Sequence, residues 1–127
     1  MAFLSPTIAS FNCHGLSRTV KQNAVIELAR ARKVDILVLQ ETYVHRLRQI
    51  RSFDATFGTR SYWGIGASGS RGLAIVLMPR FTGSVLRYFR DSDGRLMSMD
   101  LDSGIRIVNV YAPNDFRSQK DFFAAFG

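Results

Sequence analysis

The chain has 127 residues, of which 46% are hydrophobic and 21% are charged, so it can fold as one domain and is too apolar to be disordered. Lys and Arg outnumber Asp and Glu by 17 to 10, and this net charge of +7 favours nucleic acid as the partner, with a merely soluble basic surface as the alternative. No apolar run approaches the roughly 20 residues that cross a bilayer, and the amino terminus lacks the pattern of a secretion signal. Because the single Cys13 cannot form an internal disulfide, we expect a reducing compartment, nuclear or cytoplasmic.

The first half of the chain alternates between strand and helix patterns. Residues 7–11 are typical of a strand and lead into a polar loop. Thr19 and Gln22 have the spacing of a capping box, which predicts a helix to Arg32. Its expected apolar face consists of Val20, Ala24, Leu28 and Ala31.

The segment 36–39 is apolar on successive residues, which indicates a central strand buried on both faces. Tyr43, Leu47, Ile50 and Phe53 then recur at helical spacing and predict a second helix with a basic outer face.

The second half reads as strands joined by turns. Strands are expected at 72–78, 83–89, 96–101 and 105–111, with turns at 91–94 and 102–104, and a last helix is expected to begin near Ser118. Together these patterns predict an α/β fold with a mixed, largely antiparallel sheet and helices on one face. Because strand 36–39 is apolar on both sides, we expect the second face of that sheet to be bare within this chain.

Polar side chains follow three of the predicted strands. Asn12 follows the first, Glu41 follows the central strand, and Tyr111 and Asn114 follow the last. Ligands of open α/β sheets gather at the carboxyl ends of strands, so these side chains should converge. A carboxylate beside amide and phenol groups suits Mg²⁺ with a bound phosphodiester. From the residues alone, Glu41 is either a metal ligand or a salt-bridged strand end.

Four sequence blocks, 10–16, 35–42, 71–76 and 108–114, resemble in order and spacing successive blocks of the endonuclease/exonuclease/phosphatase superfamily. The likeness is greatest to the endonuclease domains of LINE-type retrotransposons, with apurinic/apyrimidinic endonucleases more distant. It extends over nearly the whole chain. The Leu39-Gln40-Glu41-Thr42 strand end and the Tyr111-Ala112-Pro113-Asn114 block together are the specific part of the resemblance.

The resemblance implies a DNase I-like, four-layer α/β sandwich and hydrolysis of a phosphodiester by an activated water with Mg²⁺, or with Mn²⁺ in its place. Position by position, Glu41 would be a metal ligand and Asn12 would order the metal and phosphate network. Tyr111 would meet the scissile phosphate and Asn114 the neighbouring backbone. Asn114 and Arg71 are the expected nucleic-acid contacts.

Two departures limit what the resemblance implies. His14 stands where apurinic/apyrimidinic endonucleases have aspartate, which weakens any assignment to abasic-site repair. The family's later aspartate-x-asparagine and aspartate-histidine blocks do not occur after Asn114. We therefore expect residues 1–127 to be the amino-terminal half of a DNA endonuclease domain, inactive alone. The alternatives are a phosphatase of the same superfamily, acting on inositol lipids or nucleotides, and a non-catalytic protein that binds DNA or self-associates. The expected partners are DNA and either the missing carboxyl-terminal half or a second copy at the bare sheet face.

Overall fold

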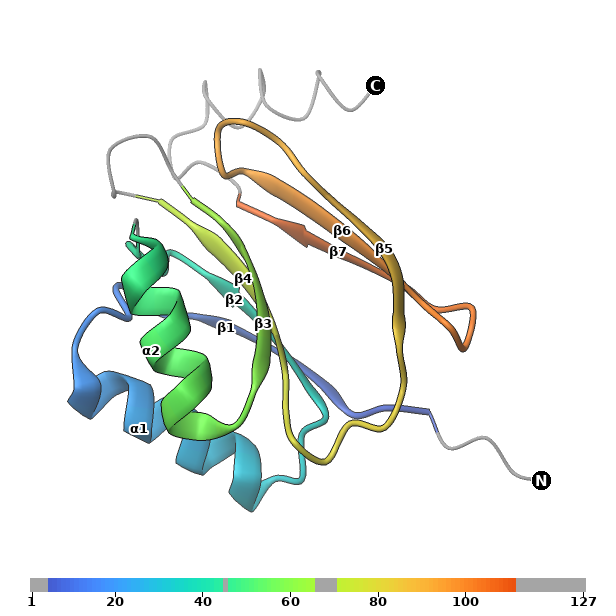
Figure 1. Cartoon of the computed structure of the whole chain (residues 1–127), viewed down its shortest axis with the longest axis horizontal. Coiled ribbons are helices and arrows are strands. Elements are labelled where there is room, and N and C mark those ends of the chain that lie inside the picture. Colours follow the sequence, from blue (N-terminus) through green and yellow to red (C-terminus); the bar gives the residue numbers. More distant parts are fainter. Residues whose placement is uncertain (1–4, 45, 66–70, 112–127) are drawn as a thin grey trace.

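The computed structural model describes residues 5–44, 46–65 and 71–111. The elements follow in the order β1 (Ile8–Asn12), α1 (Thr19–Ala31), β2 (Ile36–Gln40), α2 (Leu47–Phe57), β3 (Arg60–Gly64), β4 (Leu73–Leu77), β5 (Val85–Arg90), β6 (Leu96–Leu101) and β7 (Arg106–Val110). They form an α/β fold of three layers (Figure 1): two helices, a four-stranded sheet and a three-stranded sheet. In the part of the chain that is described, no helix is long and apolar enough to span a membrane.

The four-stranded sheet, here called sheet A, has the order β1-β2-β4-β3. β1 is parallel to β2, with α1 as the crossover, whereas β4 is antiparallel to both β2 and β3. The carboxyl ends of β1 and β2 therefore lie at the same edge as the amino end of β4. Sheet B is the antiparallel meander β5-β6-β7.

The helices cover one face of sheet A and enclose the first core with it. Phe53 and Phe57 of α2 pack beside Trp63 of β3, and the rings of Phe53 and Trp63 meet edge to face with centroids 5.7 Å apart. The Trp63 indole Nε1 donates a hydrogen bond to Ser61 Oγ. This aromatic group fixes α2 against the β3 side of the sheet.

The predicted details of both helices need correction. α1 begins at Thr19, but in the described structure its cap position, Arg18, makes no side-chain cap bond, and Gln22 donates instead to the carbonyl of Leu16. The face turned to the core carries Val25, Ile26 and Ala29, not the expected stripe, of which Val20 is 82% exposed. α2 begins at Leu47, so Tyr43 lies in the preceding loop.

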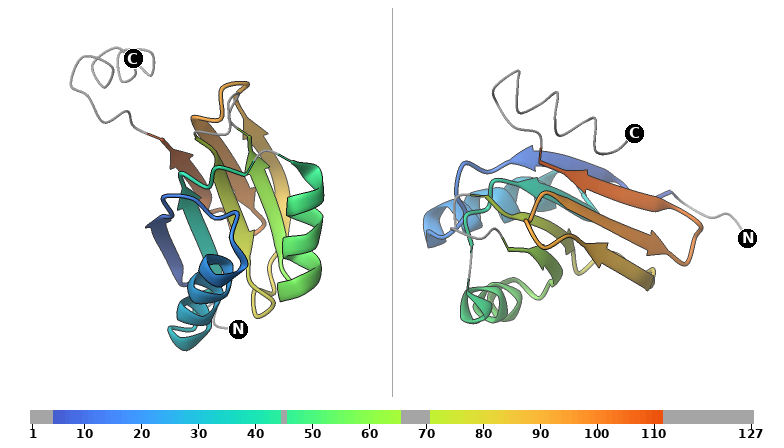
Figure 2. Two further views of the ribbon diagram at one scale, coloured as in Figure 1. Left: turned by 90° about the vertical axis from the view of Figure 1, so that its left-hand side faces the viewer. Right: turned by 90° about the horizontal axis from the view of Figure 1, so that it is seen from above.

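The expectation of a bare second face on sheet A is wrong, because sheet B of the same chain covers it. Alternate residues of β6, namely Met97, Met99 and Leu101, point inward and are fully or almost fully buried. They pack on the opposite face of the central strands in a second core. The sequence pattern did not separate the second group of strands from the first, so one continuous sheet was inferred where the chain folds back as two (Figure 2).

A buried amide joins the two sheets. Asn109 of β7 is 1% exposed, and its Nδ2 donates to the carbonyls of Leu39 and Ala74, each at 3.0 Å. Gln40 Nε2 donates to Asn109 Oδ1, also at 3.0 Å. At the opposite edge of sheet B, Arg90 of β5 donates to the carbonyl of Trp63 at 2.8 Å. The sandwich is therefore fixed by directional bonds at both sides as well as by apolar packing.

The open part of the fold is the flank at β1. Among the described strands β1 pairs with β2 alone, and its side chains are more exposed than those of β2 on both faces. Ile8 and Phe11 are 42% and 38% exposed. Sheet B reaches over β2 and β4 and leaves a hollow between β1 and β7. We call β1, the hollow and the adjoining side of α1 the β1 flank.

Replacing Asn109 by Ala should lower the free energy of unfolding by about 3 kcal/mol, since the three hydrogen bonds of this buried amide are lost. Denaturant unfolding measures this. The matched control is Val108→Ala on the same strand, whose side chain is 52% exposed and should change stability little. Equal effects of the two substitutions would show that the amide does not hold the sheets together.

Candidate metal and phosphate site

Polar groups at the ends of four strands meet at one edge of the sandwich. Asn12 is the last residue of β1, and Glu41 follows the parallel strand β2. Arg71 precedes β4, and Tyr111 follows β7. The pairing of Leu39 with Ala74, and the bonds of Asn109 to both, place the end of β7 over the same edge. The predicted convergence of Asn12, Glu41 and Tyr111 is therefore what the topology produces. Asn114 lies outside the described residues.

The loop that carries Glu41 is tied to its neighbours on both sides. On one side, the N–H groups of Gly15 and Leu16 donate to the carbonyls of Glu41 and Thr42, both at 2.7 Å. On the other, the N–H of Tyr43 donates to the carbonyl of Arg71 at 2.9 Å. The backbone of Glu41 is thus held in place by hydrogen bonds on both sides of its loop.

The backbone at this edge is strained. Of the four described non-glycine residues with positive φ, three lie here: His14 at 49°, Glu41 at 53° and Tyr43 at 57°. Such conformations are unfavourable for residues with a Cβ and cluster at functional sites. Gly72 has φ +118° and approaches so closely that an added Cβ would overlap Thr42 Oγ1. The strain is maintained by the backbone bonds on either side of the loop.

The carboxylate of Glu41 is almost buried and has two partners. Its side chain is 9% exposed, and Oε2 lies 3.2 Å from Nδ1 of His14, which is 73% exposed. Tyr43 donates its hydroxyl to Oε1 at 3.3 Å. Burial, and then the charge of Glu41, raise the pKa of Tyr43, so its hydroxyl remains a hydrogen-bond donor at neutral pH. One carboxylate oxygen therefore faces an imidazole and the other a phenol.

Three other predicted residues, Asn12, Arg71 and Tyr111, lie at the same edge of the sandwich. Asn12 Oδ1 accepts the N–H of His14 at 3.1 Å and thereby shapes the loop after β1. The guanidinium of Arg71 lies over the ring of Tyr111, 5.9 Å from its centroid. A guanidinium over an aromatic ring can still bind an anionic phosphate through its free N–H groups.

The donor set fits a divalent cation in part. Glu41 and Asn12 offer the oxygen ligands that Mg²⁺ takes, and Mg²⁺ is usually held by one or two carboxylates with water and phosphate completing its shell. Within the described residues no group of three or more His, Cys, Asp and Glu side chains could enclose a metal. The described residues therefore offer only part of the ligand set that such a cation takes.

Three contributors were missed by the sequence reasoning. His14 was considered only as a departure from the aspartate of apurinic/apyrimidinic endonucleases, Tyr43 was placed on a helix, and Gly72 was only part of a block. Positive φ at a non-glycine residue leaves little trace in the sequence. The Cys13-His14-Gly15 loop directly after a strand was the available signal, since Gly15 has φ +102° and an added Cβ would lie 3.1 Å from the Tyr43 ring.

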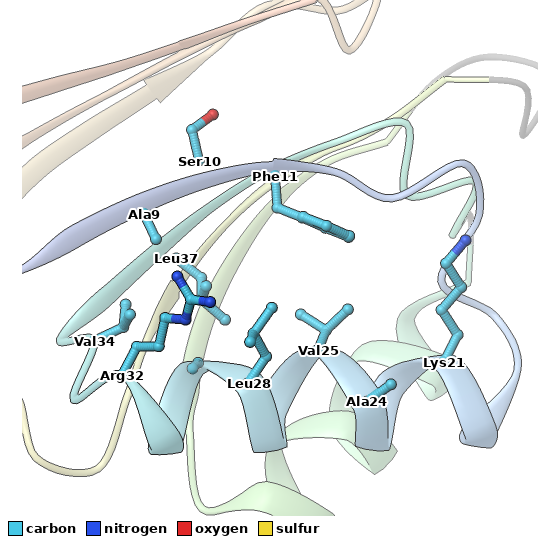
Figure 3. Close-up of a pocket in the computed structure, with 11 residues that line it drawn as sticks. Ala9, Ser10, Phe11, Lys21, Ala24, Val25, Leu28, Arg32, Val34 and Leu37 are labelled. Atoms are coloured by element: carbon cyan, nitrogen blue, oxygen red, sulfur yellow. The ribbon is translucent and has the colours of Figure 1, made fainter.

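A second concavity lies apart from this site and is apolar. It is a crevice of about 330 Å³ between α1 and β1 (Figure 3). Phe11 and Leu28 face each other across it, with Lys21 and Arg32 near its two ends. It offers no catalytic group other than these cations, so it belongs to the β1 flank as a packing surface.

Cys13 should be chemically inert in the folded chain. Burial raises the pKa of its thiol to about 12, with Glu41 adding to the effect and Lys21 opposing it. At pH 8 the thiolate fraction, and with it the rate of reaction with a disulfide reagent, should be at least about a hundredfold lower than in the urea-unfolded chain. Because the folded pKa exceeds the unfolded value, the stability gained from a neutral thiol is complete below about pH 9 and is lost as the pH rises toward 12. A native labelling rate equal to the unfolded rate would contradict this.

Comparisons with known proteins identify the family and the fold of this chain. A family model described as endonuclease/exonuclease/phosphatase family matches residues 9–124. An AP endonuclease from Archaeoglobus fulgidus is 25% identical with a TM-score of 0.65, over 84% of this chain and 40% of that one. A 3' phosphatase from Neisseria, NExo, bound to a product DNA hairpin, is 23% identical with a TM-score of 0.73, over 96% and 50%. No curated protein gives a match.

These solved structures are about twice as long as the chain, which spans 40% of the first and 50% of the second. Members of the matched family are phosphodiester hydrolases and typically use Mg²⁺. The family match covers far more than half of the sequence. The chain therefore belongs to the endonuclease/exonuclease/phosphatase family, and its two-sheet α/β fold matches half of a DNase I-like domain.

Proposed function

We propose that this chain is the amino-terminal portion of a Mg²⁺-dependent DNA endonuclease and that it is inactive alone. The observation that carries the proposal is the carboxylate of Glu41, which is 9% exposed and lies at the edge of the sandwich where the strand ends meet. The loop that carries it has positive φ angles and is hydrogen-bonded to its neighbours on both sides. Burial of a charge is unfavourable unless a partner compensates it. A divalent cation is the compensating partner in the family to which the chain belongs.

The net charge of the chain and the residues at the rim of the site favour DNA as the substrate. The net charge of +7 attracts polyanions, and Arg71 and Tyr111 stand together beside Glu41. One structural neighbour was determined with a DNA hairpin bound, which is consistent with this choice. We further propose a source in a LINE-type element, on the resemblance of blocks 35–42 and 108–114. Coding sequence for a reverse transcriptase beyond Gly127 would support that source.

In this proposal each residue has a limited task. Glu41 holds the cation from the protein side, and Asn12 shapes the loop that faces it. Arg71 and Tyr111 orient the phosphate at the rim, and Asn114 contacts the adjoining DNA backbone. When bound, the ion would neutralise charge on the phosphate and lower the pKa of a bound water. A positioned base for that water is a separate requirement.

We assign no base for that water among the described residues, and the chain spans about half of its structural neighbours. We propose that a complementary carboxyl-terminal half supplies it and docks on the β1 flank, where β1 has an open edge and Phe11 and Leu28 are exposed. Backbone pairing and apolar burial would both be available there. A second copy is the competing occupant of the same flank.

The isolated chain with ample Mg²⁺ should nick supercoiled plasmid no faster than its Glu41→Gln form. The physical reason is that a cation alone does not position or deprotonate the attacking water, and general base catalysis contributes about 10²- to 10⁴-fold. Salt-dependent plasmid binding should persist in both forms. Nicking by the isolated chain that depends on both Mg²⁺ and Glu41 would falsify the proposal that the site is incomplete.

Complementation tests the other half of the proposal. A carboxyl-terminal fragment carrying the aspartate-x-asparagine and aspartate-histidine blocks should restore Mg²⁺-dependent nicking when mixed with this chain. Glu41→Gln should lose the restored activity. Phe11→Asp, which charges the β1 flank away from Glu41, should lower the affinity between the fragments while leaving Mg²⁺ affinity unchanged. Restored cleavage of phosphomonoesters without nicking would favour the phosphatase alternative.

A further inference from the structure

The imidazole of His14 stands at ligand distance from the carboxylate of Glu41. Nδ1 and Oε2 are 3.2 Å apart. Two donor atoms that bind one octahedral ion at about 2.1 Å, at right angles to each other, lie about 3.0 Å apart. The observed separation thus matches one edge of a metal coordination shell as well as it matches a simple hydrogen bond.

Both donors are held in place by the backbone. His14 and Glu41 each have a positive φ, and the loops that carry them are joined by the bond from Gly15 N–H to the Glu41 carbonyl at 2.7 Å. Asn12 Oδ1 accepts the His14 N–H and fixes that residue from the other side. Two strained residues facing each other across a rigid pair of loops indicate a selected arrangement rather than a chance surface contact.

One of the two side chains is nearly buried and the other is exposed, as expected for the ligands of an ion bound at the protein surface. Glu41 is 9% exposed and approaches from the protein interior, whereas His14 is 73% exposed and borders the solvent. An ion between them would be bound by Glu41 on its interior side and by His14 on its solvent side. Its remaining coordination positions would be available to water or phosphate. Tyr43 takes the other carboxylate oxygen, which leaves Oε2 for the ion.

We propose that His14 Nδ1 is a second protein ligand of the cation held by Glu41, and that this nitrogen shifts the metal preference from Mg²⁺ toward Mn²⁺ and later transition ions. Imidazole nitrogen binds first-row transition metals well, while Mg²⁺ prefers oxygen throughout its shell. The inference rests on the metal site of the proposed function. It adds the identity of a ligand and a direction of selectivity, both of which are specific to this chain's histidine.

The probe is Mn²⁺ with the tag-free full chain, followed by electron paramagnetic resonance. Electron spin echo modulation should show ¹⁴N coupling to bound Mn²⁺ in the unmodified chain. The coupling should vanish in His14→Asp and His14→Ala and persist in His45→Ala, the control at the chain's other histidine. His14→Asp tolerates positive φ and keeps an oxygen donor, so it guards against misfolding of the alanine form.

Competition titrations give the second readout. The ratio of Mn²⁺ to Mg²⁺ affinity should fall roughly tenfold in His14→Asp, and Mn²⁺ affinity should fall roughly tenfold in His14→Ala. Tighter Mn²⁺ binding in His14→Ala would mean that the imidazole competes with the metal for Glu41, and this would overturn the inference.

The metal site and the assignment of His14 to it can be tested separately. Unchanged Mn²⁺ binding in Glu41→Gln would remove the metal site itself and with it the proposed function. Binding that depends on Glu41 but shows no ¹⁴N coupling in the unmodified chain would leave that site intact and remove His14 from it.

Discussion

The amide of Asn109 is the interaction on which the arrangement of this chain depends. It is an uncharged polar group in the middle of an apolar interface, and it bonds at once to β2, to β4 and to the side chain of Gln40. Apolar packing alone lets two sheets slide over each other, because methionine and leucine side chains adapt to many registers. Three directional bonds permit one register. That register brings the end of β7, and so Tyr111, over the ends of β1 and β2.

The same network ends next to the candidate site. Gln40, which donates to Asn109, also donates to Ser10 Oγ at 3.1 Å, and the next residue is Glu41. Sheet B, β2 and β1 are therefore linked through one glutamine immediately before the strained loop. The unfavourable φ values of Glu41 and Tyr43 persist because the residues before and after them cannot relax. Rigidity at the sheet interface and strain at the site are parts of one arrangement.

The sequence was sufficient for most of the elements, but it did not predict β3 (Arg60–Gly64) or the layering of the sheets. The apolar run at 36–39 and the alternation at 96–101 correspond to β2 and β6 within one residue at either end. Polar residues after strand ends also predicted where Asn12, Glu41 and Tyr111 would converge. The division into two sheets was not predictable from the alternation of apolar and polar residues. The same alternation in β6 is expected whether its methionines pack on another sheet of this chain or on a second chain. The predicted apolar face of α1 was wrong because the apolar residues of that helix occupy more than one face. The place of His14 at the site was not predicted because its positive φ depends on tertiary hydrogen bonds.

The position of Trp63 has a consequence for how this molecule can be observed. It is the chain's single tryptophan, it is 4% exposed, and it lies in the core between α2 and sheet A, edge-on to Phe53. Its side chain has no part in the core between the two sheets, where Met97 and Met99 are buried. Intrinsic fluorescence therefore monitors the helical layer, while near-ultraviolet signals from Tyr62 and Tyr88, whose rings are 4.8 Å apart, monitor the junction of sheet A with sheet B. The two optical signals separate the two halves of the sandwich without any label, so a chain in which sheet B detaches first would lose the tyrosine signal while its tryptophan emission stayed native.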